Sequence, residues 1–275
     1  MAKRLLLIGL ITLALMGCDS KKDEQQVQPD PRSEQAVDKA DEAPEPDVPS
    51  VSKEELEWIP DQPADMEPLD VAHVPTAGQA ARGASEEDAL VTIVEFGDYG
   101  CPDTEARREL VRELLDEYGD HVRYVYRNVV WVPGEYGPFA ANLAMAAAQN
   151  DQYWKSYEII WQRFRKLEEY GKESYLEPLG LTLKDLQRAE RFAKQRADEN
   201  NDLAKKLDVQ WVPTFFVNGV PLVKLGDEDV QRFVEVQIAK SHKMRESRNL
   251  KGEDLYKALV ASNKEHQEMA REGKE

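Results

Sequence analysis

The sequence predicts an α/β domain in which a β-α-β half and a β-β-α half are separated by a helical insertion. The first half is indicated by an apolar run at 90–96, an amphipathic helical pattern, and a β-branched and aromatic run at 122–127. The second half is indicated by two apolar runs that meet at Asn218-Gly219, a dipeptide typical of tight hairpins. Between the halves lies a stretch with apolar residues at helical spacing.

In the first half we expect strands at 90–96 and 122–127, joined by a helix over 103–118. The helical pattern gathers four apolar residues on one face: Leu110, Val111, Leu114 and Leu115. A helix that connects two parallel strands crosses over with right-handed sense in nearly all proteins. We therefore expect a right-handed β-α-β unit.

The insertion is predicted to contain helices over 139–149, 153–167 and 183–207. The first is rich in alanine, and the last is charged and periodic. The middle one carries large apolar and aromatic side chains at helical spacing: Trp154, Tyr157, Ile160, Trp161 and Phe164. We interpret these side chains as part of the core rather than as a ligand pocket.

In the second half we expect strands at 214–217 and 220–225, and a closing helix over 227–239 with Asp227 as its N-cap. The complete order is β-α-β, helices, β-β-α. That order is the connectivity of a thioredoxin fold with a helical insertion between its two halves.

Composition divides the chain into four parts: a lipoprotein signal peptide (1–17), an acidic, proline-rich disordered linker (18–70), the α/β domain (71–240), and a charged, partly helical tail (241–275). The linker is too polar to bury a core and should act as an extended spacer. Its one apolar cluster is Leu56, Trp58 and Ile59. We interpret that cluster as a chance grouping or a short contact onto the domain, rather than as a partner-docking motif.

The N-terminus resembles a bacterial lipoprotein signal. A basic start is followed by an apolar run at 5–16 that is too short to span a membrane comfortably, and Leu15-Met16-Gly17-Cys18 closes it. The resemblance implies cleavage before Cys18 and acylation of its sulfur, which would tether the protein to a bilayer at the periplasmic face of the cell envelope. Asp19 resembles a signal that retains lipoproteins in the inner membrane. An uncleaved anchor helix and an ordinary secretory signal are the alternatives.

The net charge of −17 argues against nucleic-acid binding, because phosphate contacts require a basic surface. The four histidines are scattered along the sequence, and the chain has no phosphate loop or dinucleotide motif. We therefore expect neither a metal site nor a cofactor.

Cys101 directly follows the first predicted strand and precedes Pro102, a residue suited to the first position of a helix. The free backbone N–H groups of a first helical turn favour a negatively charged sulfur, so this is a plausible place for a redox thiol. A redox pair would have a second cysteine at position 104, where this chain has threonine. The chain has only two cysteines, so acylation of Cys18 would leave Cys101 as its sole thiol.

Three segments resemble the DsbA family of disulfide oxidoreductases in its lipid-anchored branch. They are Val91 to Pro102, the stretch that begins at Pro138-Phe139-Ala140, and Val212-Pro213-Thr214-Phe215-Phe216-Val217-Asn218-Gly219. The resemblance covers about 71–240. It implies that Pro213 is cis, faces the cysteine, and exposes the backbone of Val212 to an extended substrate, so that Pro102, Val212 and Pro213 are the expected substrate-binding residues. A trans proline that opens a strand is the alternative.

The resemblance also implies a role for Glu95, on the strand that leads to Cys101. A buried carboxylate there would have a raised pKa and could carry protons to or from the thiol. The alternative is an ordinary solvent-facing glutamate on a strand.

The family pattern Cys-Pro-X-Cys is replaced here by Cys101-Pro102-Asp103-Thr104. A single thiol can attack a substrate disulfide, but another thiol must then resolve the mixed disulfide. Asp103 should raise the thiol pKa, and a hydrogen bond from the Thr104 hydroxyl to the thiolate would partly offset this effect.

Two functions are therefore open. The first is thiol-disulfide exchange through Cys101 with exported proteins that carry thiols or disulfides, or with a small thiol such as glutathione. The second is a redox-inactive chaperone or adaptor that binds extended peptides beside Val212 and Pro213.

Overall fold

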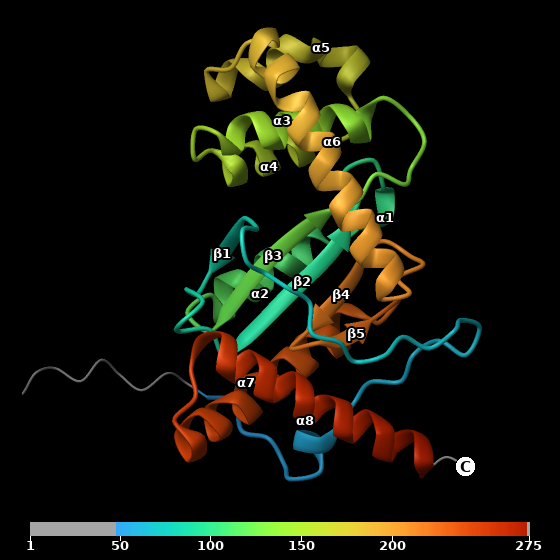
Figure 1. Ribbon diagram of the computed structural model, residues 1–275, viewed down its shortest axis with the longest axis vertical. Helices are drawn as coiled ribbons and strands as arrows, with labels where there is room; N and C mark the ends of the chain where they lie inside the picture. The colour runs from blue at the N-terminus through green and yellow to red at the C-terminus, as the bar shows by residue number, and fades with distance from the viewer. Residues whose placement is uncertain (1–47, 274–275) are drawn as a thin grey trace, which may run out of the picture. The chain divides into compact units, whose positions relative to one another are not determined.

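The computed structural model describes residues 48–273, which form a mixed α/β unit built on a five-stranded sheet (Figure 1). Cys18 and Asp19, on which the anchoring prediction depends, lie outside the described residues. No helix within 48–273 combines the length and the hydropathy needed to cross a bilayer.

The sheet has the strand order β1-β3-β2-β4-β5. The strands are β1 (Ala81–Gly83), β2 (Val91–Gly97), β3 (Val122–Asn128), β4 (Thr214–Val217) and β5 (Val220–Leu222). Strands β2 and β3 are parallel and the other neighbours are antiparallel, as the predicted β-α-β and β-β-α halves require. Every residue of β2 is buried because helices cover both faces of the sheet. The thioredoxin-fold prediction is confirmed.

The helix predicted over 103–118 is divided into α1 (Pro102–Ala106) and α2 (Arg108–Tyr118). The division lies at Arg107, whose guanidinium contacts Asp227 and the carbonyl of Leu225. These contacts tie the break in the helix to the loop that precedes the closing helix. The apolar face of α2 packs onto the sheet as predicted.

The helical insertion lies at one end of the sheet (Figure 1). It consists of α3 (Tyr136–Ala148), α4 (Tyr153–Gln162), α5 (Leu167–Leu176), the 3₁₀ turn η2 (Glu177–Leu179) and α6 (Leu183–Lys206). Helix α4 ends five residues earlier than predicted, and α5 was not predicted as a separate helix. The predicted core residues Tyr157, Ile160 and Trp161 are buried, whereas Trp154 and Phe164 are partly buried against the same core.

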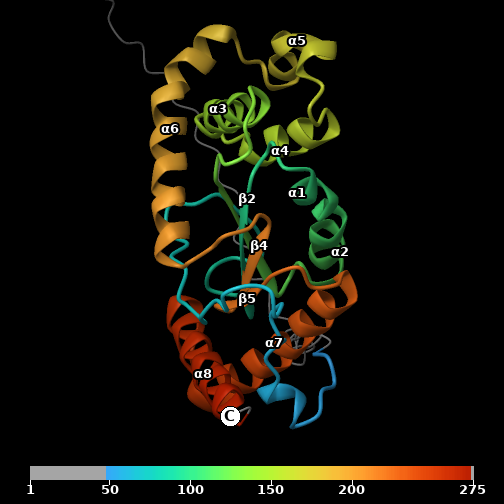
Figure 2. The same cartoon turned by 90° about the vertical axis from the view of Figure 1, so that its right-hand side faces the viewer.

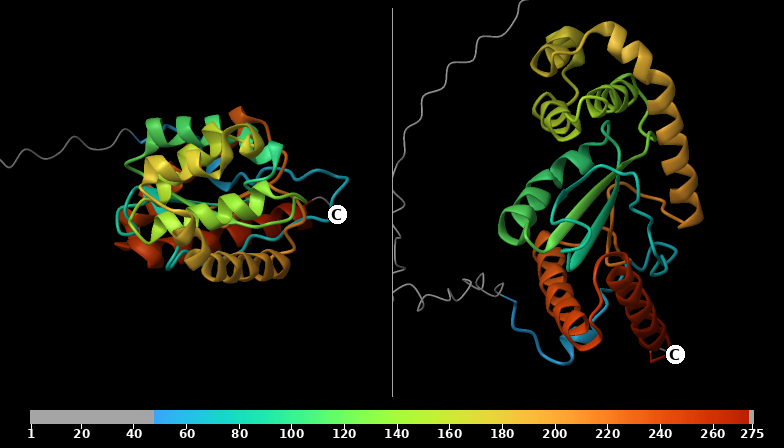
Figure 3. Two further views of the ribbon diagram at one scale, coloured as in Figure 1. Left: turned by 90° about the horizontal axis from the view of Figure 1, so that it is seen from above. Right: turned by 60° about the vertical axis from the view of Figure 1, so that its left-hand side comes forward.

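Two long helices follow the last strand, α7 (Asp227–Arg248) and α8 (Gly252–Glu272). On one side of the sheet lie α2 and α7, and on the other lie α8 and the end of α6 (Figures 2 and 3). Helix α7 is longer than the closing helix predicted over 227–239. The tail that was predicted to be partly helical contains α8, which buries the apolar residues Leu255, Leu259 and Val260. The N-cap prediction for Asp227 is wrong: Gly226 has the extended N-cap conformation, and Asp227 begins the helix.

The described part of the predicted linker packs on the domain. A 3₁₀ turn, η1 (Glu55–Glu57), places Glu55 against Arg232, and the ring of Trp58 meets that of Phe233 edge-on at 5.6 Å. The domain contact that we considered for the apolar cluster is thus present. The linker boundary predicted at residue 70 is too late, because a few apolar anchors hold an otherwise polar segment in place.

Candidate functional site

Cys101 lies at the turn between β2 and α1 and is the N-cap of that helix, with Pro102 at the first helical position. The side chain is only 7% exposed, while Pro102 is exposed beside it. The thiol Sγ lies 3.7 Å from the carbonyl oxygen of Val212, to which it donates. Two segments more than a hundred residues apart in the sequence therefore meet at the sulfur.

The peptide bond between Val212 and Pro213 is cis, as predicted. Strand β4 begins at the next residue, Thr214, whose hydroxyl donates to the carbonyl of Trp211 at 2.8 Å. This bond closes the turn in front of β4. The turn presents the Val212 carbonyl to Cys101.

Thr104, which stands where a second cysteine is expected, is fully buried. Its hydroxyl accepts a hydrogen bond from the backbone N–H of Asp98 at 3.3 Å. Within the described residues, no hydrogen bond joins Thr104 to Cys101. The predicted hydrogen bond to the thiolate is therefore not formed in this state of the site.

Asp98 organises the turn that carries Cys101, a role the sequence reasoning missed. Its buried carboxylate accepts from the backbone N–H of Gly100 at 2.7 Å, of Trp131 at 2.6 Å and of Val132 at 2.7 Å. Hydrogen bonds to an ionised acceptor are stronger than neutral ones. Asp98 thereby ties the cysteine turn to the loop that leads into the insertion. An aspartate directly after a buried strand was the only available sequence signal.

Glu95 is 2% exposed, so the predicted burial is confirmed. Burial raises the pKa of Glu95 to about 8, an effect opposed by the hydroxyl of Tyr124, which donates to the carboxylate at 2.5 Å. At neutral pH the side chain is therefore a neutral acid. Its role as a proton carrier stays a prediction.

Gly97 brings Glu95 and Thr104 close to each other. A β-carbon at this position would lie 2.8 Å from Glu95 Oε1 and 2.9 Å from Thr104 Cγ2. It would also lie 2.6 Å from the ring of Tyr126. Only glycine leaves room for these three side chains, and the sequence reasoning did not single it out.

A cluster of tyrosines connects the sheet beneath the site to the insertion. The ring centroids of Tyr99 and Tyr126 are 5.0 Å apart, and those of Tyr126 and Tyr157 are 5.4 Å apart. Burial raises the pKa of each of these hydroxyls above its ordinary value, so all three are neutral at physiological pH. Glu95 itself accepts a hydrogen bond from Tyr124, and the charge of Arg107 also acts to lower its pKa against the effect of burial.

An open groove of about 840 Å³ has Val212 in its lining, the residue whose carbonyl oxygen contacts the Cys101 sulfur. Of the three predicted substrate-binding residues, Val212 and Pro213 line it together with Trp211, whereas Pro102 is not among its lining residues. The Trp211 ring is 47% exposed, and Lys224 Nζ lies 4.2 Å from its centroid.

The described residues include no group of three or more His, Cys, Asp or Glu side chains arranged to hold a metal ion. Two histidines make contacts elsewhere: His73 Nε2 lies 2.9 Å from Glu253, and His266 Nδ1 lies 3.0 Å from Lys240 Nζ. The candidate site therefore consists of the thiol, the cis-proline turn, and the buried acid.

The sheet topology, together with a cysteine that faces a cis proline, defines a protein of the thioredoxin-fold class. The family model described as thioredoxin matches residues 75–236, and the chain belongs to that family. The resemblance to thioredoxin-fold disulfide oxidoreductases is thereby confirmed.

The chain is 28% identical over 171 residues to disulfide bond formation protein D of Bacillus subtilis, covering 55% of this chain and 73% of that protein. It is 34% identical over 135 residues to the Na(+)/H(+) antiporter NhaA 3 of Salinispora tropica, covering 48% of this chain and 21% of the antiporter. It thus spans about a fifth of the antiporter's length. A thioredoxin-like oxidoreductase from Silicibacter pomeroyi matches with a TM-score of 0.51 at 29% identity, covering 58% of this chain and 91% of that one.

Proposed function

We propose that the protein performs thiol-disulfide exchange through Cys101, as an exported, lipid-anchored member of its family. The observation that supports this most directly is the 3.7 Å approach of the Cys101 sulfur to the Val212 carbonyl at the edge of an open groove. A substrate chain that lies along Val212 would bring its own sulfur to the same place. Similarity to a disulfide bond formation protein and to a thioredoxin-like oxidoreductase supports the same chemistry.

The proposed exchange has two steps. The Cys101 thiolate attacks one sulfur of a substrate disulfide, a bond forms between the two sulfurs, and the other substrate sulfur leaves as a thiolate. Another thiol, either glutathione or a substrate cysteine outside the original disulfide, then attacks the substrate sulfur of the mixed disulfide as a thiolate, forms a new disulfide with it and releases Cys101 as a thiolate. In this proposal Glu95, whose raised pKa of about 8 keeps it mostly protonated at neutral pH, gives protons to or takes them from the Cys101 thiol.

A redox-inactive, peptide-binding function is the second candidate. Two observations favour it: the thiol is almost fully covered and bonded to Val212, and Thr104 makes its hydrogen bond to Asp98. In this function the groove beside Trp211 holds an extended peptide, and Cys101 does not react.

Trapping separates the two candidates. The purified full chain is incubated with glutathione disulfide and with disulfide-containing exported proteins, and adducts on Cys101 are identified by mass spectrometry. If the protein performs exchange, the native chain should carry adducts on Cys101 that a reductant removes. A Cys101→Ser variant should carry no adduct at residue 101. If the native chain and the Cys101→Ser variant both bind peptide and neither forms an adduct, the second candidate is supported. If neither adducts nor peptide binding are found, both candidate functions are contradicted.

Lipid anchoring through Cys18 and a spacer that precedes residue 48 are parts of the same proposal. They would hold the domain at the periplasmic face of a membrane, with Asp19 favouring the inner one. Expression in a bacterial host with fractionation tests the anchor. The native chain should enter the membrane fraction with an acylated N-terminal cysteine, whereas Cys18→Ser should not be acylated. Equal acylation of the two forms would refute the anchor without affecting the Cys101 chemistry.

A further inference from the structure

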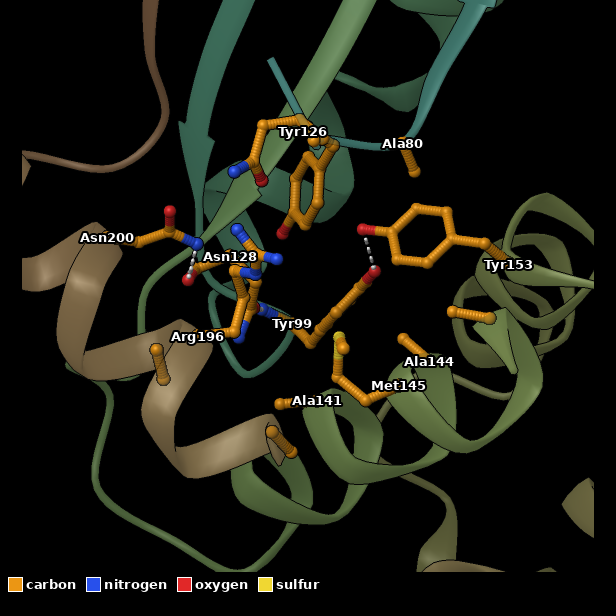
Figure 4. A pocket seen from close by; sticks show the side chains of 15 residues that line it. Ala80, Tyr99, Tyr126, Asn128, Ala141, Ala144, Met145, Tyr153, Arg196 and Asn200 are labelled. Carbon is orange, nitrogen blue, oxygen red and sulfur yellow. Dashed lines mark hydrogen bonds between the residues drawn. The ribbon is translucent and has the colours of Figure 1, made fainter. Parts of the chain in front are cut away.

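A second, separate cavity lies between the sheet and the helical insertion. It has a volume of about 100 Å³, and Cys101 does not line it. Its polar lining comes from Gln79, Tyr99, Tyr126, Asn128, Tyr153, Arg196 and Asn200 (Figure 4). Alanines of α3 and α6, together with Met145, form the apolar part of its wall.

Tyr126 contributes a buried polar group with no partner. The residue is 2% exposed, and its hydroxyl makes no hydrogen bond to any described residue. An unpaired hydroxyl in the interior destabilises the fold, so such groups usually have a partner. The ring extends from β3 into the cavity, toward the Arg196 side chain of α6 (Figure 4). A ligand with an acceptor atom would supply the missing partner.

The remaining polar groups also offer donors. The hydroxyls of Tyr99 and Tyr153 lie 3.2 Å apart and share one hydrogen bond, which leaves one of their two protons free. Asn128 uses its side-chain oxygen to accept from the backbone of Tyr99 at 3.4 Å, and its amide protons remain free within the described part of the chain. The cavity wall is therefore rich in donors.

The electrostatics of the cavity favour an anion. Within the described part of the chain, Arg196 has one ion-pair partner, Glu199 on the same helix, and the separation of 3.5 Å is long for such a pair. The Arg196 side chain is 36% exposed. None of the described residues that line the cavity carries a carboxylate. The nearby acid Glu95 is neutral at physiological pH because burial raises its pKa to about 8. Arg196 is thus the only charged side chain among the described lining residues.

We propose that this cavity is a binding site for a small carboxylate. One oxygen would accept from the Tyr126 hydroxyl and the other from the Arg196 guanidinium, while the hydrocarbon part packs against Met145 and the alanines. The size agrees with this class, because a cavity of roughly 150 Å³ holds benzene and this one is smaller. The competing occupant is a small group of ordered water molecules.

Calorimetric titration of the full chain with sodium propionate, at constant ionic strength in sodium chloride, tests the proposal. Propanol is the matched neutral probe, since it has the same number of carbon atoms and no carboxylate. We expect saturable one-to-one binding of propionate and at least about tenfold weaker binding of propanol, because charge-assisted hydrogen bonds to the carboxylate are lost. Equal heats for propionate and propanol, or no heat beyond that of chloride, would overturn it and favour water.

Two variants locate the site. Tyr126→Phe and Arg196→Gln should each weaken propionate binding by about tenfold or more. Arg191→Gln is the matched control, because Arg191 is exposed on α6, the helix that also carries Arg196. This variant should leave propionate affinity unchanged. Tyr126→Phe removes an unpaired hydroxyl, so its melting temperature should equal or exceed that of the native chain. Propionate affinity that is unchanged in both test variants would contradict the proposed site.

Discussion

The backbone N–H of Asp98 donates to the hydroxyl of Thr104, across the turn that carries Cys101. Thr104, at the position where a second cysteine was expected, therefore helps to hold the turn. Thr104 is buried and is the third residue of α1, the helix for which Cys101 is the N-cap.

Thr104→Cys should create a closable dithiol. A cysteine sulfur is a weaker acceptor than a hydroxyl, so the free energy of unfolding should fall by about 1 kcal/mol through the weakened bond to Asp98. After exposure to glutathione disulfide, alkylation and mass spectrometry should show an internal disulfide between positions 101 and 104. Thr104→Ser is the matched control, because it keeps the hydroxyl and adds no thiol. A double-cysteine variant that stays reduced under these conditions would show that the site no longer supports the reaction.

The buried acid Glu95 gives stability a specific pH dependence. Its pKa is about 8 in the folded chain, against an ordinary value of 4.5, because burial disfavours the charged form. Between these values the folded state binds a proton that the unfolded chain has released, so the free energy of unfolding falls as pH rises, by about 1.4 kcal/mol per unit. Above pH 8 the contribution becomes constant.

Glu95→Gln should remove this slope while keeping an acceptor for Tyr124. Urea unfolding at pH 5, 6, 7 and 8 measures it: the stability of the variant relative to the native chain should rise steadily over this range. In Tyr124→Phe the carboxylate loses the hydrogen bond that lowers its pKa, so the slope should extend to higher pH. Parallel pH profiles for the native chain and Glu95→Gln would refute the raised pKa.

Asp98→Ala should cost more stability than most surface substitutions. The change leaves three backbone N–H groups without their acceptor, the buried one of Gly100 and the partly buried ones of Trp131 and Val132. Each unpaired buried donor costs about 1–3 kcal/mol, and partial rehydration reduces the sum, so we expect a loss of about 3 kcal/mol. Denaturant unfolding measures the loss, and amide exchange should be accelerated at these three residues. Asp98→Asn, which keeps one carbonyl oxygen, should lose less.

The sequence predicted the elements whose pattern is regular. Strands β2 to β5 and helices α2, α3 and α6 were found because their apolar residues recur with a clear period or adjoin a distinctive turn. Strand β1 was missed because Ala81–Gly83 is too short to show alternation. Helix α5 was missed because Gly171 has a positive φ in its middle and breaks the pattern.

The candidate site was predictable only where a residue carries recognisable chemistry. Cys101, Glu95 and Pro213 were found from motif and resemblance, and the structure brings the first and the last together. The roles of Asp98 and Gly97 could not be read from the sequence. They depend on backbone N–H groups and side chains that converge from separate segments, and such convergence leaves no local pattern.

Gly97→Ala tests whether close packing positions the buried acid. The added methyl would lie within 3 Å of the Tyr126 ring, Glu95 Oε1 and Thr104 Cγ2, so at least one of these side chains must move. Overpacking of this kind costs about 1–3 kcal/mol. Because displacement of Glu95 would change its burial, the pH dependence of unfolding should also shift. Gly273→Ala, where the nearest atom is at an ordinary 3.4 Å, is the control. If Gly97→Ala matches that control in both stability and pH profile, Gly97 does not hold Glu95 and Thr104 in place.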